Sequence, residues 1–454
     1  MSMATDVRPE TSGRLTGKTI AALKEARDNI TNVYYLGRVY LIMAATLVAA
    51  IWLIEQQRAG AFSFWWNIPI VILAITIIGA SQHQLGGATH EATHFILFRN
   101  RRANELVSDW LCMFPLYSTT YQFRLHHLAH HQFINDPERD PDFYQLHDSG
   151  HDLDFPLEHV QFFKALLSQL WLPNLVRYTL TRARYNGLGV DTNPYRDKTR
   201  KTSRGPNVVI GGYSIVLPLV LSVLSIFLFD YLTLALLFVG FGAAAIAYLL
   251  SVPEEQYPAT HIKPIIAHKT TALSRIVFFM VLYTGLSLVE YFGVLPAWPY
   301  YLLLWVLPLF TTFPFFMIMR QWVQHGNADR GRLTNTRVFL VNPFVRYAVF
   351  PFGMDYHLPH HIYAAVPHFR LPELHDLLRR SDPDYAREGV VVEGYFRSPH
   401  PDAGNPTVVE VLGPVYARRG DEVFIASDAI EDAEVDDARH IREEEAESRR
   451  QTSG

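Results

Sequence analysis

The residues with the clearest capacity for chemistry are histidines gathered in three short clusters. These clusters are the segments 90–94 (HEATH), 127–131 (HLAHH) and 357–361 (HLPHH). A helix repeats every ~3.6 residues, so residues three or four positions apart share one face. Imidazole is a common nitrogen ligand of iron, zinc and copper. The histidine content predicts only roughly 0.04 chance matches to HxxHH in a chain of this length, whereas the sequence contains two. The clusters therefore predict a metal site.

The number of clustered histidines restricts what kind of metal site this is. The predicted ligands are His90, His94, His127, His130, His131, His357, His360 and His361. First-row metals rarely take more than about six ligands, and a catalytic ion keeps a position open. These imidazoles are too many for one working ion, whereas two ions with about four nitrogens each would use them all. No EF-hand spacing or carboxylate-rich repeat is present, which argues against calcium and magnesium.

Several neighbouring residues are candidates for the surroundings of this site. His325 is a possible ninth ligand or an ordinary interfacial histidine, and the residues alone favour neither. His126 and His127 compete for one ligand position, and we predict His127. Metal-bound histidines usually donate their second ring nitrogen to a carboxylate or carbonyl. The carboxylates beside the clusters are Glu91, Asp140, Asp142 and Asp355, of which Asp140 and Asp142 also read as a turn.

Long apolar runs must position the clusters. Hydrophobic residues make up 49% of the chain and charged residues only 19%. Six runs approach the length needed to cross a ~30 Å hydrocarbon core: 39–54, 65–80, 206–229, 231–251, 276–292 and 298–319. We therefore predict an all-α integral membrane protein with about six transmembrane helices in hairpins. A helical cap would carry the histidine clusters, and a small soluble extension would follow.

The distribution of positive charge predicts the orientation. The loop 99–204 carries fourteen Lys and Arg residues, whereas the turn after the first run has only Arg58. The turns near Asp230 and Gly293 have none. By the positive-inside rule, the large loop, both termini and all three clusters face the cytoplasm. Charge and clustering are independent signals, and they agree.

Composition also divides the chain and excludes some functions. We predict a cytoplasmic segment 1–32, a membrane catalytic domain 33–385, a soluble extension 386–427 and an acidic, disordered tail 428–454. Within the extension, 407–412 and 422–425 are predicted short strands. A net charge of −4 gives no sign of nucleic-acid binding. The single cysteine excludes a disulfide framework and any thiolate-held cluster within this chain.

The order and local context of the clusters resemble the membrane-bound fatty acid desaturase superfamily. HxxxH followed by RNRRAN, HxxHH followed by Asp-Pro-Asp, and a distant YHLPHH after two hydrophobic hairpins are similar to its three histidine boxes. The resemblance covers roughly residues 35 to 380. It is specific for the superfamily, which also contains hydroxylases and ketolases, and poorly specific for substrate.

The resemblance implies a non-haem diiron centre on the eight box histidines, with O₂ as oxidant. His325 matches the extra histidine that precedes the third box. Family members often have Asn four residues before it, holding a metal-linked water, where this chain has Gln321. Glu91 and Asp355 would support the ligands. A lipid or acyl substrate would lie in the bilayer, and electrons would come from a separate ferredoxin or cytochrome b5 type carrier with its reductase.

Other functions remain open at this point. A hydroxylase or ketolase of a carotenoid, sterol or alkyl lipid would use the same boxes. A membrane metal-dependent lipid hydrolase would need fewer histidines and would work without oxygen. A metal transporter predicts ionisable residues at mid-bilayer, and the runs contain few of them. We expect a desaturase that introduces a double bond into a fatty-acyl or related lipid chain.

Overall fold

The computed structural model describes residues 16–188, 193–197, 199, 202–258, 260–417, 420 and 422–425. The start of the predicted N-terminal segment and the whole predicted acidic tail lie outside these residues. The described chain is mostly helical, and its strands are only three residues long. This confirms the predicted all-α class.

Six helical segments are long and apolar enough to cross a membrane, which confirms the predicted number. They are Thr31–Arg58, Phe64–Thr93, Gly205–Ser225, Tyr231–Ser251, His268–Tyr291 and Ala297–His325. Their helices are α2 (Thr31–Arg58), α3 (Asn67–Thr93), α9 (Gly205–Gly211), α10 (Leu217–Ser225), α11 (Tyr231–Ser251), α12 (His268–Tyr291), α13 (Ala297–Tyr301), α14 (Leu307–Phe310) and α15 (Thr312–His325). The chain is therefore a multi-pass membrane protein.

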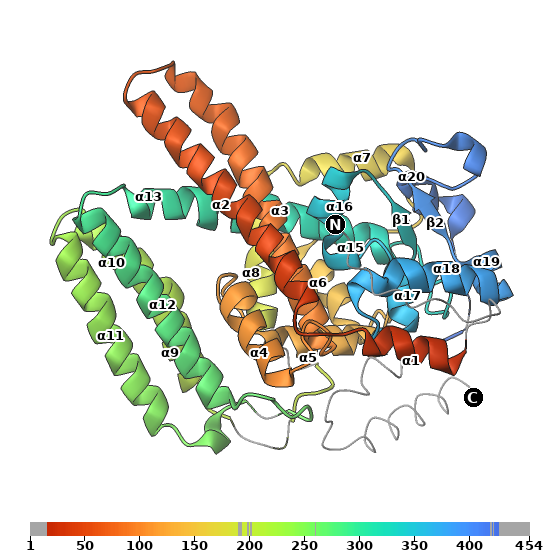
Figure 1. The fold of residues 1–454 in the computed structure, drawn as a ribbon, viewed down its shortest axis with the longest axis horizontal. Coiled ribbons are helices and arrows are strands. Elements are labelled where there is room, and N and C mark those ends of the chain that lie inside the picture. Colours follow the sequence, from red (N-terminus) through yellow and green to blue (C-terminus); the bar gives the residue numbers. More distant parts are fainter. Residues whose placement is uncertain are drawn as a thin grey trace.

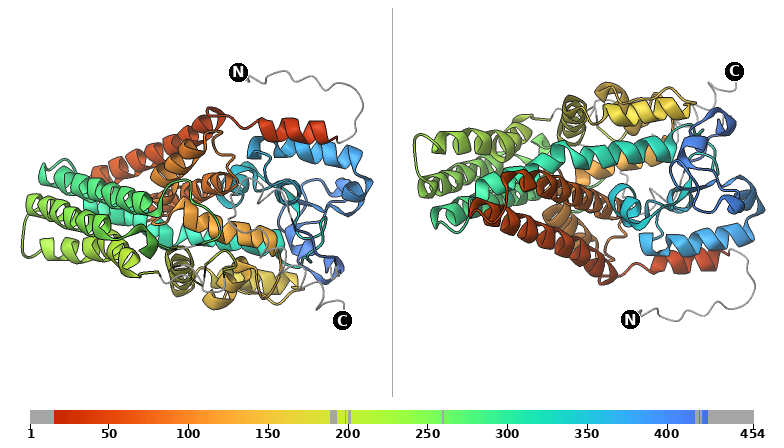
Figure 2. Two further views of the ribbon diagram at one scale, coloured as in Figure 1. Left: turned by 90° about the horizontal axis from the view of Figure 1, so that it is seen from below. Right: turned by 90° about the horizontal axis from the view of Figure 1, so that it is seen from above.

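The remaining elements form the part of the molecule that carries most of the charged side chains. They are α1 (Gly17–Glu25), α4 (Arg101–Ser108), α5 (Thr120–Gln132), α6 (Pro141–Ser149), α7 (His159–Ser168), α8 (Leu172–Leu188), β1 (Val338–Leu340), α16 (Pro343–Val349), α17 (His357–Ile362), α18 (Leu371–Ser381), α19 (Pro383–Glu388), β2 (Val391–Glu393) and α20 (Val408–Val411). The hairpin α2–α3 and the helices α10–α12 project from this part (Figure 1). Figure 2 shows the projecting helices at one end and the C-terminal elements at the other.

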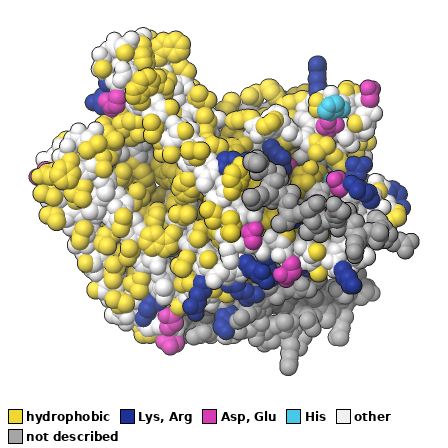
Figure 3. Space-filling model, in the orientation of Figure 1, with side chains coloured by type: hydrophobic (Ala, Val, Ile, Leu, Met, Phe, Trp, Pro, Cys, Tyr) yellow, Lys and Arg dark blue, Asp and Glu magenta, His cyan; other side chains and the backbone are white. Residues whose placement is uncertain are grey.

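The projecting helices have the surface expected of lipid-facing segments. Only 22% to 39% of each apolar window is buried inside the protein. In the space-filling view, hydrophobic side chains cover the projecting part, while most charged side chains lie on the remainder (Figure 3). Large apolar side chains such as Leu41 and Phe227 are exposed there. A hydrocarbon environment would cover these faces.

Proline shapes one of the spans without breaking it. A π-helical turn, Gly212–Val216, precedes Pro218 and joins α9 to α10. Proline cannot donate the hydrogen bond to the carbonyl four residues before it. That carbonyl belongs to Ser214, and it accepts a hydrogen bond from the Tyr283 hydroxyl of α12 at 2.5 Å. A neighbouring helix thus satisfies the freed backbone group, as a low-dielectric environment requires.

Helix α3 lies at the centre of the packing because small residues let its neighbours approach closely. A Cβ atom at Gly79 would overlap Thr312 at the start of α15. A Cβ atom at Gly87 would overlap Pro351 in the turn after α16. At ~1.5 Å per residue, α3 is longer than a ~30 Å hydrocarbon core. Its last turns therefore extend into the cap, where they are completely surrounded by protein.

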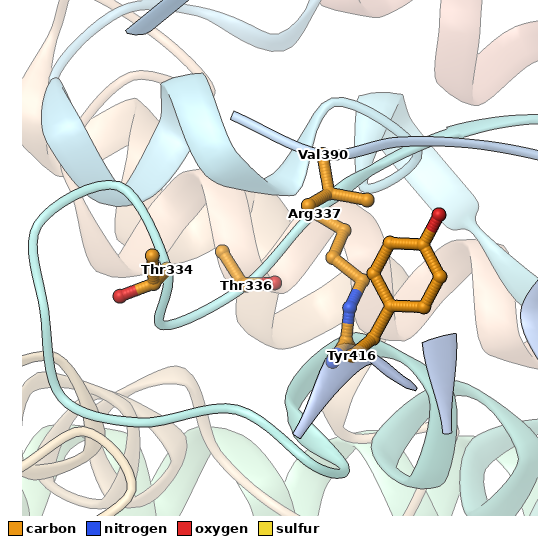
Figure 4. A pocket seen from close by; sticks show the side chains of 5 residues that line it. All are labelled: Thr334, Thr336, Arg337, Val390 and Tyr416. Atoms are coloured by element: carbon orange, nitrogen blue, oxygen red, sulfur yellow. The ribbon is translucent and has the colours of Figure 1, made fainter. Parts of the chain in front are cut away.

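The C-terminal extension packs onto the chain that follows α15. Strand β2 pairs in parallel with β1, so that Val392 lies opposite Phe339. A small pocket there is lined by Thr334, Thr336, Arg337, Val390 and Tyr416 (Figure 4). The extension and the chain after α15 thus share one packed layer.

The predicted strand at 407–412 is wrong, because these residues include the short helix α20. The Thr407 side chain accepts a hydrogen bond from the Glu410 N–H, and the Glu410 carboxylate accepts one from the Thr407 N–H. This reciprocal capping box favours a helical turn over an extended segment. Residues 422–425 are not a strand either.

Candidate metal centre

Four helix ends bring the histidine clusters together. The last turn of α3 carries His90 and leads into His94, and α5 carries the second cluster. Helix α15 ends at His325. Helix α17 holds the third cluster, with Pro359 in its first turn, where a missing N–H costs nothing. All nine predicted ligand histidines converge, and eight are buried.

The nine histidines form two groups, each with ligand atoms within 4.8 Å of one another. The first group is His90, His94, His127, His131 and His360. In it, His127 Nε2 lies 2.9 Å from His94 Nε2 and 3.0 Å from His131 Nε2. His131 Nε2 is also 3.1 Å from His360 Nε2. The Nε2 atoms therefore point at a common centre.

The second group is His130, His325, His357 and His361. His357 Nε2 is 2.9 Å from His325 Nε2 and 3.0 Å from His361 Nε2. The two groups adjoin, because the rings of His131 and His361 stack with centroids 4.3 Å apart. This arrangement suits two neighbouring ions rather than one.

The donor set fits first-row transition metals. Buried polar atoms normally have hydrogen-bond partners, yet both ring nitrogens of His90 have none, and the contacts of His127 Nε2 are with other ring nitrogens. Converging imidazole nitrogens without carboxylate or thiolate neighbours in the groups favour iron, copper or zinc over calcium or magnesium. A bound metal would occupy the space between nitrogens that otherwise face only one another.

Electrostatics hold most of these rings in the ligand form. Burial, followed by the neighbouring histidines, lowers the pKa of His127, His131, His357 and His361 well below the usual value. Burial also lowers the pKa of His360 to about 3. Neutral imidazole is the form that binds a metal. The rings are therefore ready to coordinate without first losing a proton.

His130 differs because it has carboxylate partners. Burial lowers its pKa, but Asp140 and Asp142 outweigh burial and raise it to about 8. His130 Nδ1 lies 3.0 Å from both oxygens of Asp140. Asp140 in turn accepts from the backbone N–H groups of Asn135 and Asp142 at 2.9 Å each. An imidazole whose Nδ1 donates to a fixed carboxylate presents Nε2 to a metal.

Two further contacts distinguish a histidine that faces the second group from one that lies outside both groups. His325 Nδ1 is 3.1 Å from the Asn335 carbonyl oxygen, so its Nε2 faces the second group. His126 Nε2 is 2.8 Å from Asp142 Oδ1 and lies outside both groups. The geometry thus places His127, and not His126, in the first group, and the role of His127 as a metal ligand stays a prediction.

The three residues predicted to support the ligands lie near the site in different ways. Glu91 Oε1 is 3.7 Å from His90 Nδ1, and its other oxygen accepts from the His368 N–H at 2.8 Å. Gln321 accepts from the Tyr178 hydroxyl at 2.5 Å. The contact that the structure gives to the Asp355 carboxylate is with Arg346 Nε, at 2.8 Å. Their supporting roles stay predictions.

Unusual backbone conformations flank every histidine segment. Phe95, Asn135, Asn327 and Phe352 all have positive φ, between 47° and 58°. A side chain with a Cβ rarely adopts this region, and such strain concentrates at functional sites. Each strained residue lies where the chain turns sharply next to a cluster. The surrounding packing therefore has to hold these turns in place.

Sequence reasoning missed a buried ion pair that joins the first two clusters. Arg124 is fully buried, and its guanidinium forms a bidentate pair with Glu105. It also donates to the carbonyl oxygens of Ala92, at 2.8 Å, and Thr93, at 3.1 Å. These carbonyls immediately precede His94. A single arginine beside three histidines gave no signal in the sequence, because basic residues are usual near membrane interfaces.

A pocket opens onto both histidine groups. The first group contributes His90 and His127 to its wall, and the second contributes His130, His325 and His357. The rest of the wall is Phe123, His126, Asp142, Arg182, Arg320, Gln321, Gln324 and Met354. Only two of these side chains are apolar. This is the place where a substrate atom could reach the metal centre.

Comparison with known proteins agrees with this arrangement. The sequence profile of the fatty acid desaturase family matches residues 63–286 and 256–388, which together span more than half of the chain. A dihydrorhizobitoxine desaturase from Bradyrhizobium elkanii is 31% identical over 122 residues, which covers 26% of this chain and 31% of that relative. The residues that the family profile matches contain all nine converging histidines. The chain belongs to the fatty acid desaturase family.

Proposed function

We propose that this protein is a membrane-bound, O₂-dependent diiron desaturase that introduces a double bond into a fatty-acyl or related lipid chain. The observation that carries the proposal is the pair of adjoining histidine groups, with five and four rings. The burial of eight of the rings, the lowered pKa values of rings such as His127 and His357, and the family membership support the assignment.

Each histidine group would hold one iron ion. When bound, the iron pair would supply O₂ activation and the removal of hydrogen from an unactivated C–H bond. The chain's own residues would fix the positions of the ions, as Asp140 does by orienting the His130 ring. The surrounding buried shell would keep bulk water from the reacting bond.

The proposed orientation has the termini and the histidines on the cytoplasmic side, as the positive-inside rule indicates. A lipid would then keep its tail among the projecting helices and its head near the cap. Electrons would have to come from a separate carrier and its reductase, because Cys112 is buried and is the only cysteine of the chain. Without more cysteines the chain cannot build an iron–sulfur cluster.

Product analysis tests the reaction type. Membranes containing the protein would be supplied with O₂, NADPH and a ferredoxin or cytochrome b5 with its reductase. Mass spectrometry of the lipids should reveal products that have lost two hydrogens, and the His130→Ala variant should yield none. Products that gain an oxygen atom would instead identify a hydroxylase. Undiminished turnover without oxygen would exclude an oxygenase of either kind.

A further inference from the structure

The wall of the pocket at the metal centre contains two arginines, and neither forms a close ion pair. Arg182 of α8 and Arg320 of α15 both line it. The Arg182 guanidinium lies 5.8 Å from the centroid of the Phe123 ring, and Arg320 Nη1 contacts Met354 Sδ at 2.6 Å. Within the described part of the chain, no close ion pair joins either guanidinium to a carboxylate, although the Asp142 charge acts on Arg320 at longer range. An arginine keeps its charge in any protein environment.

The one carboxylate in the pocket wall is already engaged. Asp142 Oδ1 is hydrogen-bonded to His126, and Oδ2 is 3.8 Å from His130 Nδ1. Burial raises the pKa of Asp142, but His130, His126 and Arg320 outweigh burial and hold this pKa well below the usual value. Asp142 therefore faces Arg320 as well as the histidines, but one carboxylate against two arginines leaves the pocket wall with a net positive charge.

The pocket also contains buried hydrogen-bond donors with no acceptor. Arg320 Nε and the side-chain nitrogen of the next residue, Gln321, are both buried and unpartnered. A buried donor without an acceptor costs about 1–3 kcal/mol, and more when it is charged. A ligand that offers only acceptor atoms and a negative charge would satisfy both. Carboxylates and phosphates have this chemistry, and the arginine fork matches their geometry.

We infer that Arg182 and Arg320 bind an oxyanion of the substrate, inside the same pocket that opens onto the histidine groups. This deepens the proposed function and rests on it. The oxyanion is the carboxylate of a free acid or the phosphate of a lipid head group. The anionic group therefore lies in the site instead of remaining outside the protein.

Direct binding tests this inference without turnover. The full chain in non-ionic detergent would be titrated with radiolabelled palmitate, lysophosphatidate and hexadecanol, with and without iron. Arg320→Met and Arg182→Met should each weaken binding of one oxyanion by about 10- to 100-fold, the worth of hydrogen bonds to a charged group. Hexadecanol binding should not change. Palmitate as the affected ligand would identify a free acid, and lysophosphatidate a phospholipid.

Matched variants separate this effect from damage to the fold. Arg184, on the same helix as Arg182, is exposed, and Arg184→Met should bind all three probes as the unchanged protein does. Arg320→Lys keeps the charge and should recover part of the oxyanion binding. Equal losses for hexadecanol and both oxyanions, or no loss at all, would overturn the inference.

Different results would refute the oxyanion site and the proposed diiron function. If the unchanged protein binds two irons and desaturates lipid while the arginine variants bind oxyanions normally, only the oxyanion site is refuted. If the unchanged protein binds no iron, the diiron assignment itself is refuted.

Discussion

Replacing Arg124 by methionine should destabilise the protein and disturb the metal centre together. Arg124 makes four hydrogen bonds, two to Glu105 and one each to the carbonyls of Ala92 and Thr93. The variant would leave Glu105, whose side chain is 4% exposed, as an unpaired buried charge. Breaking a buried ion pair in this way costs about 3–5 kcal/mol. We expect a loss of that size in the free energy of unfolding, measured by reversible unfolding in mixed micelles.

The double variant Arg124→Met, Glu105→Leu separates the two effects. Removing both charges leaves no buried ion, so most of the lost stability should return. Iron binding should stay reduced, because the Thr93 carbonyl before His94 still lacks the donor that Arg124 supplied, whereas the Ala92 carbonyl keeps Asn104. As a control, Arg387→Met removes a surface pair whose arginine is 66% exposed, and it should leave the free energy of unfolding nearly unchanged. A loss below about 1 kcal/mol in Arg124→Met, or a double variant as unstable as the single one, would refute this reasoning.

Three further predictions concern individual side chains. Asp140→Asn should weaken iron retention about 10- to 100-fold against a chelator, because the partner that orients His130 is lost; unchanged retention would contradict this. His127→Ala should lose iron by elemental analysis while His126→Ala keeps it, and the reverse pattern would reassign the ligand. Burial lowers the pKa of His375 to about 4, below the ~6.5 of an unfolded chain. The unfolded state then binds more protons between these pH values, so stability falls as the pH is lowered through this window. His375→Gln should lose less stability over that range than the unchanged protein, and identical pH profiles would exclude this role.

The membrane spans and the histidine groups were predictable from the sequence because each rests on a local signal. The length of an apolar run alone indicates whether a helix can cross a membrane. Histidines three and four residues apart share one face of any helix, whatever its place in the fold. To predict that His90 lies close to His360, only one further inference was needed, namely that all clusters lie at the same end of the spans. The structure confirms that gathering.

The supporting contacts were not predictable in the same way. The bond from Arg124 to the carbonyl of Thr93 depends on how two helices dock, and no local pattern in the sequence encodes that docking. Asp140 reads as a turn residue and is also the partner of His130. Residues 407–412 were predicted as a strand, but the capping box of Thr407 with Glu410 favours a helix. In each case the partners of a side chain determined its role or the local structure, and the local sequence pattern did not reveal those partners.

The metal content of the purified protein tests the central claim most directly. Inductively coupled plasma mass spectrometry should find two irons per chain. His360→Ala, in the first group, and His130→Ala, in the second, should each bind fewer. One zinc per chain, or full iron occupancy in both variants, would contradict the diiron centre.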